Sequence, residues 1–157
     1  MKDWFAKLED ANPAMDVNFR LQPIDGEIVI VEDDALLRDL MREILVDVCA
    51  QCVAFGTADD ALIYLLQSST RCALIIADHG LPGQVQGAEL AELVRDRWPE
   101  IPIVITSGWT NTFIGLPSST NFLPKPWTLE GLVMAVADLL ESGVPDTKIP
   151  TLPRISD

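Results

Sequence analysis

Acidic residues, a hydroxyl group and a lysine stand directly after short apolar runs of this sequence. In chain order they are Glu32, Asp33, Asp78, Ser107 and Lys125. Carboxylates that lie side by side repel one another, so a cluster of them is costly without a cation, and Mg²⁺ prefers oxygen ligands. With the metal bound, one carboxylate can attack a phosphoryl group while the ammonium and the hydroxyl hold its oxygens. The residue types therefore indicate a phosphoryl-acceptor aspartate site.

The elements that must position these residues are predicted from apolar runs that alternate with helical patterns. Strands are predicted at 27–31, 51–55, 72–77, 101–106 and 121–123, and amphipathic helices follow the first three and the last. This alternation implies βαβ crossovers, so we predict an α/β fold with a five-stranded, doubly wound parallel sheet. The carboxyl ends of parallel strands meet at one edge, where such folds carry their sites. The candidate residues are therefore expected to converge.

The motifs at four of these strand ends resemble those of a known family. They are Val31-Glu32-Asp33-Asp34, Ile76-Ala77-Asp78 with Leu81-Pro82-Gly83, Thr106-Ser107-Gly108 and Lys125-Pro126. Together they resemble the receiver domain of two-component response regulators over roughly residues 26–142. The resemblance implies the flavodoxin-like receiver fold.

The resemblance also implies a role for each matching residue. Asp78 is expected to accept phosphate from a phosphohistidine on a sensor histidine kinase or a histidine phosphotransfer protein. Glu32, Asp33 and Asp78 are expected to hold Mg²⁺ together with the backbone carbonyl of Gly80. Lys125 is expected to contact the phosphoryl group, across a cis bond to the proline that follows it.

Two further residues are expected to transmit the phosphorylated state. Ser107 matches the switch hydroxyl, and Phe122 stands three residues before the lysine, at the position of the aromatic switch residue. Ser107 can also simply start a turn, and its preference over Thr106 rests on the resemblance. Asp34 is interpreted as the cap of the first helix, because its carboxylate can accept orphan backbone N–H groups.

The segment between Gly108 and Phe122 departs from the family pattern. Only residues 109–121 are available there, and Gly115 and Pro117 disfavour a helix of more than about two turns. We therefore predict a shortened or irregular fourth helix. Trp109 is two residues past the switch hydroxyl, and our hypothesis is that its ring covers Asp78 in part and slows attack by water.

Composition limits the partners and the location. The 157 residues include 11 Lys+Arg and 24 Asp+Glu, and the resulting net charge of −13 disfavours direct binding to nucleic acid or to an anionic membrane. Acids at positions 9 and 10 interrupt any secretory signal, and the apolar runs are too short to span a bilayer. A cytoplasmic location is expected.

Residues 1–25 are interpreted as an N-terminal extension, 26–142 as the receiver domain and 143–157 as a C-terminal tail. Because the tail has no room for an output domain, we expect a stand-alone receiver of a two-component or phosphorelay system, which signals by contact with a downstream protein. It is not expected to be an enzyme beyond self-catalysed phosphotransfer and dephosphorylation. Two alternatives stay open: a degenerate receiver that acts as a phosphorylation-independent interaction module, and an aspartyl-nucleophile phosphatase. Gly80 disfavours the phosphatase, since such enzymes commonly carry a second acid there.

Overall fold

The computed structural model describes residues 24–48, 51–108 and 120–142, which form alternating strands and helices. In chain order these elements are β1 (Glu27–Val31), α2 (Ala35–Asp47), β2 (Cys52–Phe55), α3 (Ala58–Gln67), β3 (Cys72–Asp78), α4 (Gly87–Arg97), β4 (Ile103–Ser107), β5 (Asn121–Pro124) and α5 (Leu129–Ser142).

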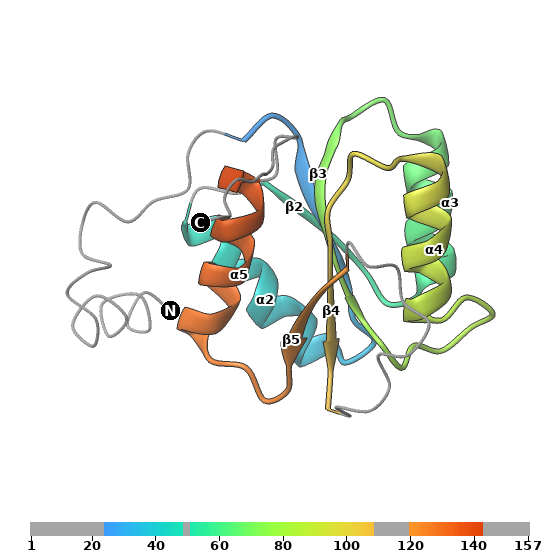
Figure 1. The fold of residues 1–157 in the computed structure, drawn as a ribbon. Helices are drawn as coiled ribbons and strands as arrows, with labels where there is room; N and C mark the ends of the chain where they lie inside the picture. Colours follow the sequence, from blue (N-terminus) through green and yellow to red (C-terminus); the bar gives the residue numbers. More distant parts are fainter. Residues whose placement is uncertain (1–23, 49–50, 109–119, 143–157) are drawn as a thin grey trace, which may run out of the picture.

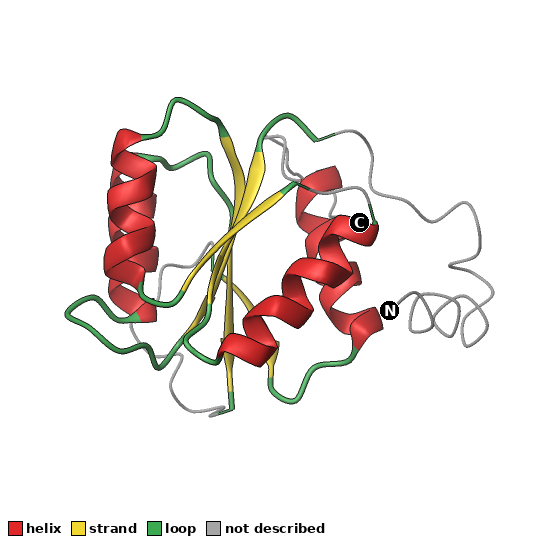
Figure 2. Cartoon of the chain, turned by 180° about the vertical axis from the view of Figure 1, so that it is seen from behind, coloured by secondary structure: helices red, strands yellow, loops and turns green. Residues whose placement is uncertain are grey.

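The five strands form one parallel sheet in the order β2-β1-β3-β4-β5. Helices α2 and α5 cover one face, and α3 and α4 cover the other (Figures 1 and 2). This confirms the predicted doubly wound α/β fold. The chain adds β2 on one side of β1 and β3 on the other, so the strand order reverses between β1 and β3. Ligand sites of such sheets lie at the carboxyl edge beside this reversal.

The sheet separates two apolar layers, and the alternation of side chains along the strands assigns each residue to one of them. Ile30 and Ile76 belong to the layer that contains residues of α2 and α5. Val29 and Ile75 belong to the layer that contains residues of α3 and α4. Because both faces are buried, the central strands read as continuous apolar runs in the sequence.

Polar caps start the helices close to the strand ends. The Asp34 carboxylate accepts hydrogen bonds from the backbone N–H groups of Leu36 and Leu37, at 3.0 and 3.3 Å, which confirms the predicted cap of α2. The Thr57 hydroxyl accepts from the Asp60 backbone N–H at the start of α3. These caps hold the first turn of each helix beside the carboxyl edge of the sheet.

The fourth strand begins and ends later than predicted. Proline has no backbone N–H, so Pro102 cannot donate to the sheet, although its carbonyl accepts from the Ile75 N–H at 3.0 Å. Regular pairing starts at Ile103 and includes Ser107, which pairs with Pro124. The predicted switch hydroxyl is therefore on the last residue of β4.

Several predictions concern residues outside the described ranges. They are the N-terminal extension as far as residue 23, the C-terminal tail at 143–157, the shortened or irregular fourth helix, and the position of Trp109 over Asp78. Among the helices that the structure describes, none is both long and apolar enough to cross a bilayer.

Candidate functional site

The regular alternation of side chains brings two acids and the lysine to the same corner of the sheet. Glu32, Asp78 and Lys125 each stand two residues beyond an apolar residue of the layer that contacts α2 and α5. Those apolar residues are Ile30, Ile76 and Leu123. Since side chains two residues apart share a face, the three polar groups continue that face beyond the core, at the carboxyl edge.

The distances show that the cluster is tight. The Lys125 Nζ atom lies 3.2 Å from Asp78 Oδ1 and 3.4 Å from Glu32 Oε1. Carboxylate oxygens of Glu32, Asp33 and Asp78 all lie within 4.8 Å of one another. Glu32 is 2 % exposed and Asp78 is 9 % exposed, whereas Asp33 is open to solvent. The structure therefore brings together four of the residues that the sequence singled out.

The three carboxylates fit a hard divalent cation. Mg²⁺ holds oxygen ligands at about 2.1 Å in an octahedron, so neighbouring oxygens on the ion lie about 3 Å apart and opposite ones about 4 Å apart. The three carboxylate oxygens, which lie within 4.8 Å of one another, would move closer together to share one ion. Negative charge collected in one buried corner is also the electrostatic reason for a cation to bind there.

Burial and neighbouring charges perturb the pKa values at this corner. Burial raises the pKa of Glu32 above its ordinary value of 4.5; the Asp78 charge adds to the rise, and the hydrogen bond from the Asp34 N–H at 3.1 Å opposes it, as does Lys125. For Lys125, burial lowers the pKa, but the carboxylates of Asp78 and Glu32 outweigh it, so the net change is upward. The lysine therefore keeps its positive charge at neutral pH.

Glu32→Gln is expected to stabilise the metal-free protein at neutral pH. A carboxyl whose pKa is higher in the folded than in the unfolded protein contributes stability below the unfolded value of 4.5 and loses it as the pH rises through the folded value. The neutral amide removes this loss. Urea unfolding in the presence of a chelator, at several pH values between 4 and 8, measures the difference.

The pH dependence identifies the cause of that stabilisation. The advantage of the variant is expected to be smallest near pH 4, where the carboxyl of the parent is protonated, and to grow toward pH 8. If the free energy of unfolding of the variant differed from that of the parent by the same amount at every pH, in either direction, packing rather than charge would be the cause of the difference.

Backbone hydrogen bonds to neighbouring strands position both residues of the Lys125–Glu32 ion pair. The Lys125 N–H donates to the Ser107 carbonyl at 2.8 Å, and the Glu32 N–H donates to the Phe55 carbonyl at 3.0 Å. Both bonds extend the sheet pattern past the last strand residue. The predicted cis peptide bond between Lys125 and Pro126 is present.

Sequence reasoning missed a residue that supports the pair from the neighbouring helix. The Arg38 guanidinium donates to the Glu32 carbonyl at 2.8 Å. Arg38 stands on the second turn of α2, and its sequence context is that of a solvated helix face. The sequence offers one indication of this role for Arg38: its helix is predicted to begin directly after the acidic strand end that contains Glu32.

The register and the alternation of side chains place Ser107 and Phe122 on the face of the sheet that α3 and α4 cover, whereas Glu32, Asp78 and Lys125 continue the opposite face. Ser107 follows Thr106, and Thr106 is the residue of β4 that pairs with Asp78. Both hydroxyl residues are buried. Phe122 pairs with Ile105, two residues before Ser107, and packs against the layer that contacts α3 and α4. The predicted switch residues are thus on one face, and their switching roles stay predictions.

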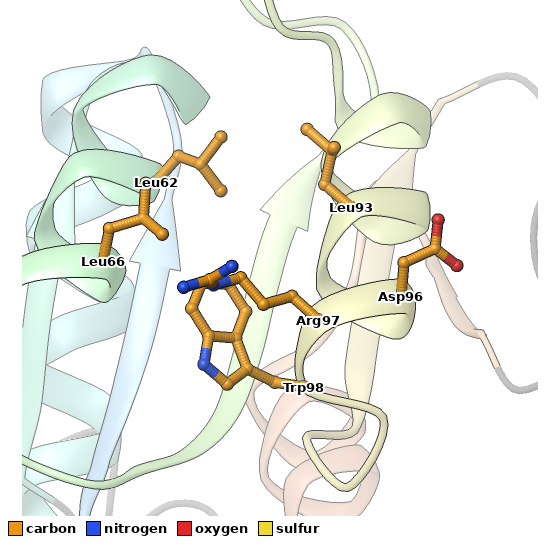
Figure 3. A pocket seen from close by; sticks show the side chains of 6 residues that line it. All are labelled: Leu62, Leu66, Leu93, Asp96, Arg97 and Trp98. Atoms are coloured by element: carbon orange, nitrogen blue, oxygen red, sulfur yellow. The ribbon is translucent and has the colours of Figure 1, made fainter.

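A pocket of about 360 Å³ lies between α3 and α4 (Figure 3). Leu66 and Arg97 stand in the last turns of their helices, so the pocket is toward the amino edge of the sheet. The Arg97 guanidinium lies 5.5 Å from the centre of the Trp98 ring. The residues that line this pocket are Leu62, Leu66, Leu93, Asp96, Arg97 and Trp98.

Fold and site together agree with one family. A model of the response regulator receiver domain matches residues 28–137, which is more than half of the chain. The chain belongs to the response regulator receiver domain family, in which two-component signalling proteins share this fold.

Individual relatives are similar at a modest level. The chain is 28 % identical over 120 residues to the hydrogenase transcriptional regulatory protein HoxA of Cupriavidus necator, covering 73 % of this chain and 24 % of the relative. The receiver domain of NtrX from Brucella abortus superposes with a TM-score of 0.62 at 27 % identity, covering 74 % of this chain and 99 % of that one. A receiver protein from Sinorhizobium medicae gives a TM-score of 0.67 at 26 % identity, covering 75 % and 96 %. The chain spans about a quarter of the length of the curated relatives it matches.

Proposed function

We propose that this chain is a phosphoacceptor: Asp78 takes a phosphoryl group from a phosphohistidine, and the phosphorylated form signals by contact with another protein. The observation that carries the proposal is the Lys125 ammonium, 3.2 Å from Asp78 Oδ1, in a corner where two further carboxylates gather. The donors implied are a sensor histidine kinase or a histidine phosphotransfer protein. The net charge of −13 favours a protein over a nucleic acid as the downstream partner.

The chemistry is the transfer of one phosphoryl group from a phosphohistidine to the unphosphorylated carboxylate of Asp78. A carboxylate oxygen of Asp78 attacks the phosphorus, the new P–O bond forms as the P–N bond breaks, and the released imidazole takes a proton from water. The product is an aspartyl phosphate. The Lys125 ammonium balances charge on the phosphoryl oxygens, and because its pKa is raised it is protonated throughout.

The metal proposed for this site is Mg²⁺, held by Glu32, Asp33, Asp78 and the backbone carbonyl of Gly80. Gly80 stands in the loop directly after β3, two residues past Asp78. When bound, the ion supplies positive charge for the oxygens of the transferring group. The Lys125 ammonium supplies only one positive charge beside three carboxylates, so it leaves net negative charge for the ion to balance.

The test supplies the purified chain with Mg²⁺ and a small phosphodonor and records the intact mass. We expect a gain of one phosphoryl group, stable in acid and labile in base, that requires the metal. A protein that binds Mg²⁺ but is never labelled would favour the degenerate receiver. Steady turnover of a phosphate ester would favour the phosphatase.

Asp33→Asn is expected to weaken Mg²⁺ binding by about tenfold or more, because one charged oxygen ligand becomes a neutral one. Asp33 is exposed, so the change should leave the free energy of unfolding within about 0.5 kcal/mol of the parent. Calorimetric titration with Mg²⁺ measures the affinity.

Asp34→Asn is the matched control for this experiment. Asp34 is the next residue and is also exposed, but its carboxylate caps α2, and asparagine caps helices equally well. Both variants lose one negative charge at the same strand end. An equal loss of Mg²⁺ affinity in the two would show that net charge rather than ligation is responsible.

A further inference from the structure

The loop that follows the phosphoacceptor is tied to a helix that takes no part in the proposed chemistry. This loop, residues 79–86, leads from β3 to α4 and contains Gly80. The Asp59 Oδ1 atom, on the first turn of α3, accepts hydrogen bonds from the backbone N–H groups of Gln84 and Val85, each at 3.2 Å. We propose that Asp59 is a positioning residue, which holds this loop so that the Gly80 carbonyl stays beside the carboxylates of the metal site.

The path of the loop shows why such a tie is needed. At its base, the Gly87 N–H donates to the His79 carbonyl at 3.2 Å, and a Cβ at Gly87 would lie 2.4 Å from the Asp78 carbonyl oxygen. Above the base, the Leu81 N–H donates to the Gln86 side chain at 3.3 Å. The exposed Gly80 has no neighbouring atom within 4 Å of an added Cβ. The side of Gly80 on which a Cβ would stand is therefore open, and these hydrogen bonds act on other residues of the loop.

The backbone conformation and the contact with Asp59 both favour glycine at position 83 of the loop. Gly83 has a φ of +94°, which side chains rarely adopt, and a Cβ there would lie 2.6 Å from Asp59 Oδ1. The apolar side of the loop is anchored as well, since Leu81 is buried in the apolar layer that also contains Ala58 and Ala61 of α3. The loop is therefore held by a buried leucine on its apolar side and by one carboxylate oxygen of Asp59 on its polar side.

The expected consequence concerns metal affinity and not the transfer itself. This inference rests on the proposed function. Without the two hydrogen bonds, the loop must be ordered when Mg²⁺ binds, and that ordering weakens binding. Residues that orient metal ligands typically change affinity by about 10- to 100-fold. We expect about tenfold for Asp59→Ala, because Leu81 and Gln86 still hold part of the loop.

The experiment compares Asp59→Ala, Asp59→Asn and Asp60→Ala with the parent chain. Asparagine keeps an oxygen that can accept both hydrogen bonds, so it should restore Mg²⁺ affinity. Asp60 is exposed on the same first turn, so Asp60→Ala controls for the lost charge at the helix start. The readouts are the Mg²⁺ affinity by calorimetry, the amide exchange of Gln84 and Val85 without metal, and the labelling rate against Mg²⁺ concentration.

The inference predicts a specific set of results. In Asp59→Ala alone, the two amides exchange faster, Mg²⁺ binds about tenfold more weakly, and the labelling rate returns to that of the parent at saturating Mg²⁺. Unchanged Mg²⁺ affinity in Asp59→Ala, or an equal loss in Asp60→Ala, would overturn the inference while leaving the proposed function intact. A parent chain that binds no Mg²⁺ would overturn both.

Discussion

Asp78→Asn is expected to abolish phosphorylation of the chain by a small phosphodonor in the presence of Mg²⁺. An amide has no carboxylate oxygen with which to form the acyl phosphate, so the loss should be complete. The fold should persist, because the amide has the shape of the carboxylate and the change relieves repulsion among three clustered acids. Intact mass after incubation with the donor measures the result.

A control for this variant is Asp96→Asn. Asp96 is exposed on α4, where it pairs with Arg95 at 3.2 Å, and it lines the pocket toward the opposite edge of the sheet. It should be labelled at the rate of the parent. Labelling of Asp78→Asn at that same rate would mean that a different residue accepts the phosphate.

Ile76→Ala is expected to lower the free energy of unfolding by about 2–5 kcal/mol, a large part of the 5–15 kcal/mol that is usual for a domain. Ile76 is fully buried in β3, where it pairs with Ile30 on one side and Val104 on the other. A smaller side chain leaves a cavity between the sheet and helices α2 and α5, because the surrounding core collapses only in part. Urea denaturation shows the loss as a lower midpoint with an unchanged slope.

Ile63→Ala deletes the same atoms where they are not buried. Ile63 is 52 % exposed on α3, and alanine is the better helix former, so its free energy of unfolding should stay within about 0.5 kcal/mol of the parent. An equal loss in both variants would contradict the described core.

Ile76 also precedes Asp78 by two residues on the same face of the sheet. Ile76→Ala should therefore also slow the phosphorylation of Asp78, because it disturbs the site.

The sheet was predictable because burial leaves a direct trace in the sequence. Cys72–Asp78 is apolar up to its final acid, as expected for a strand with helices on both faces. Period-two alternation then places Glu32, Asp78 and Lys125 on one face. Their convergence follows from strand direction alone, since parallel strands end at the same edge.

Other features depend on packing that no local pattern records. Pro102 delays the start of β4, because a residue without an N–H group does not donate to the sheet. The hydrogen bonds from Gln84 and Val85 to Asp59 join residues that are 25 and 26 positions apart, and nothing periodic links them. The raised pKa of Glu32 arises mainly from burial, which only the packed structure defines.

The most direct test of the account locates the acyl phosphate chemically. The parent chain is labelled with Mg²⁺ and a small phosphodonor, reduced with borohydride and mapped by peptide mass spectrometry, since reduction of an aspartyl phosphate leaves homoserine. We predict homoserine at position 78 and at no other position, and only when both Mg²⁺ and the donor are present. Homoserine at another aspartate, or none in a chain that binds Mg²⁺, would contradict the account.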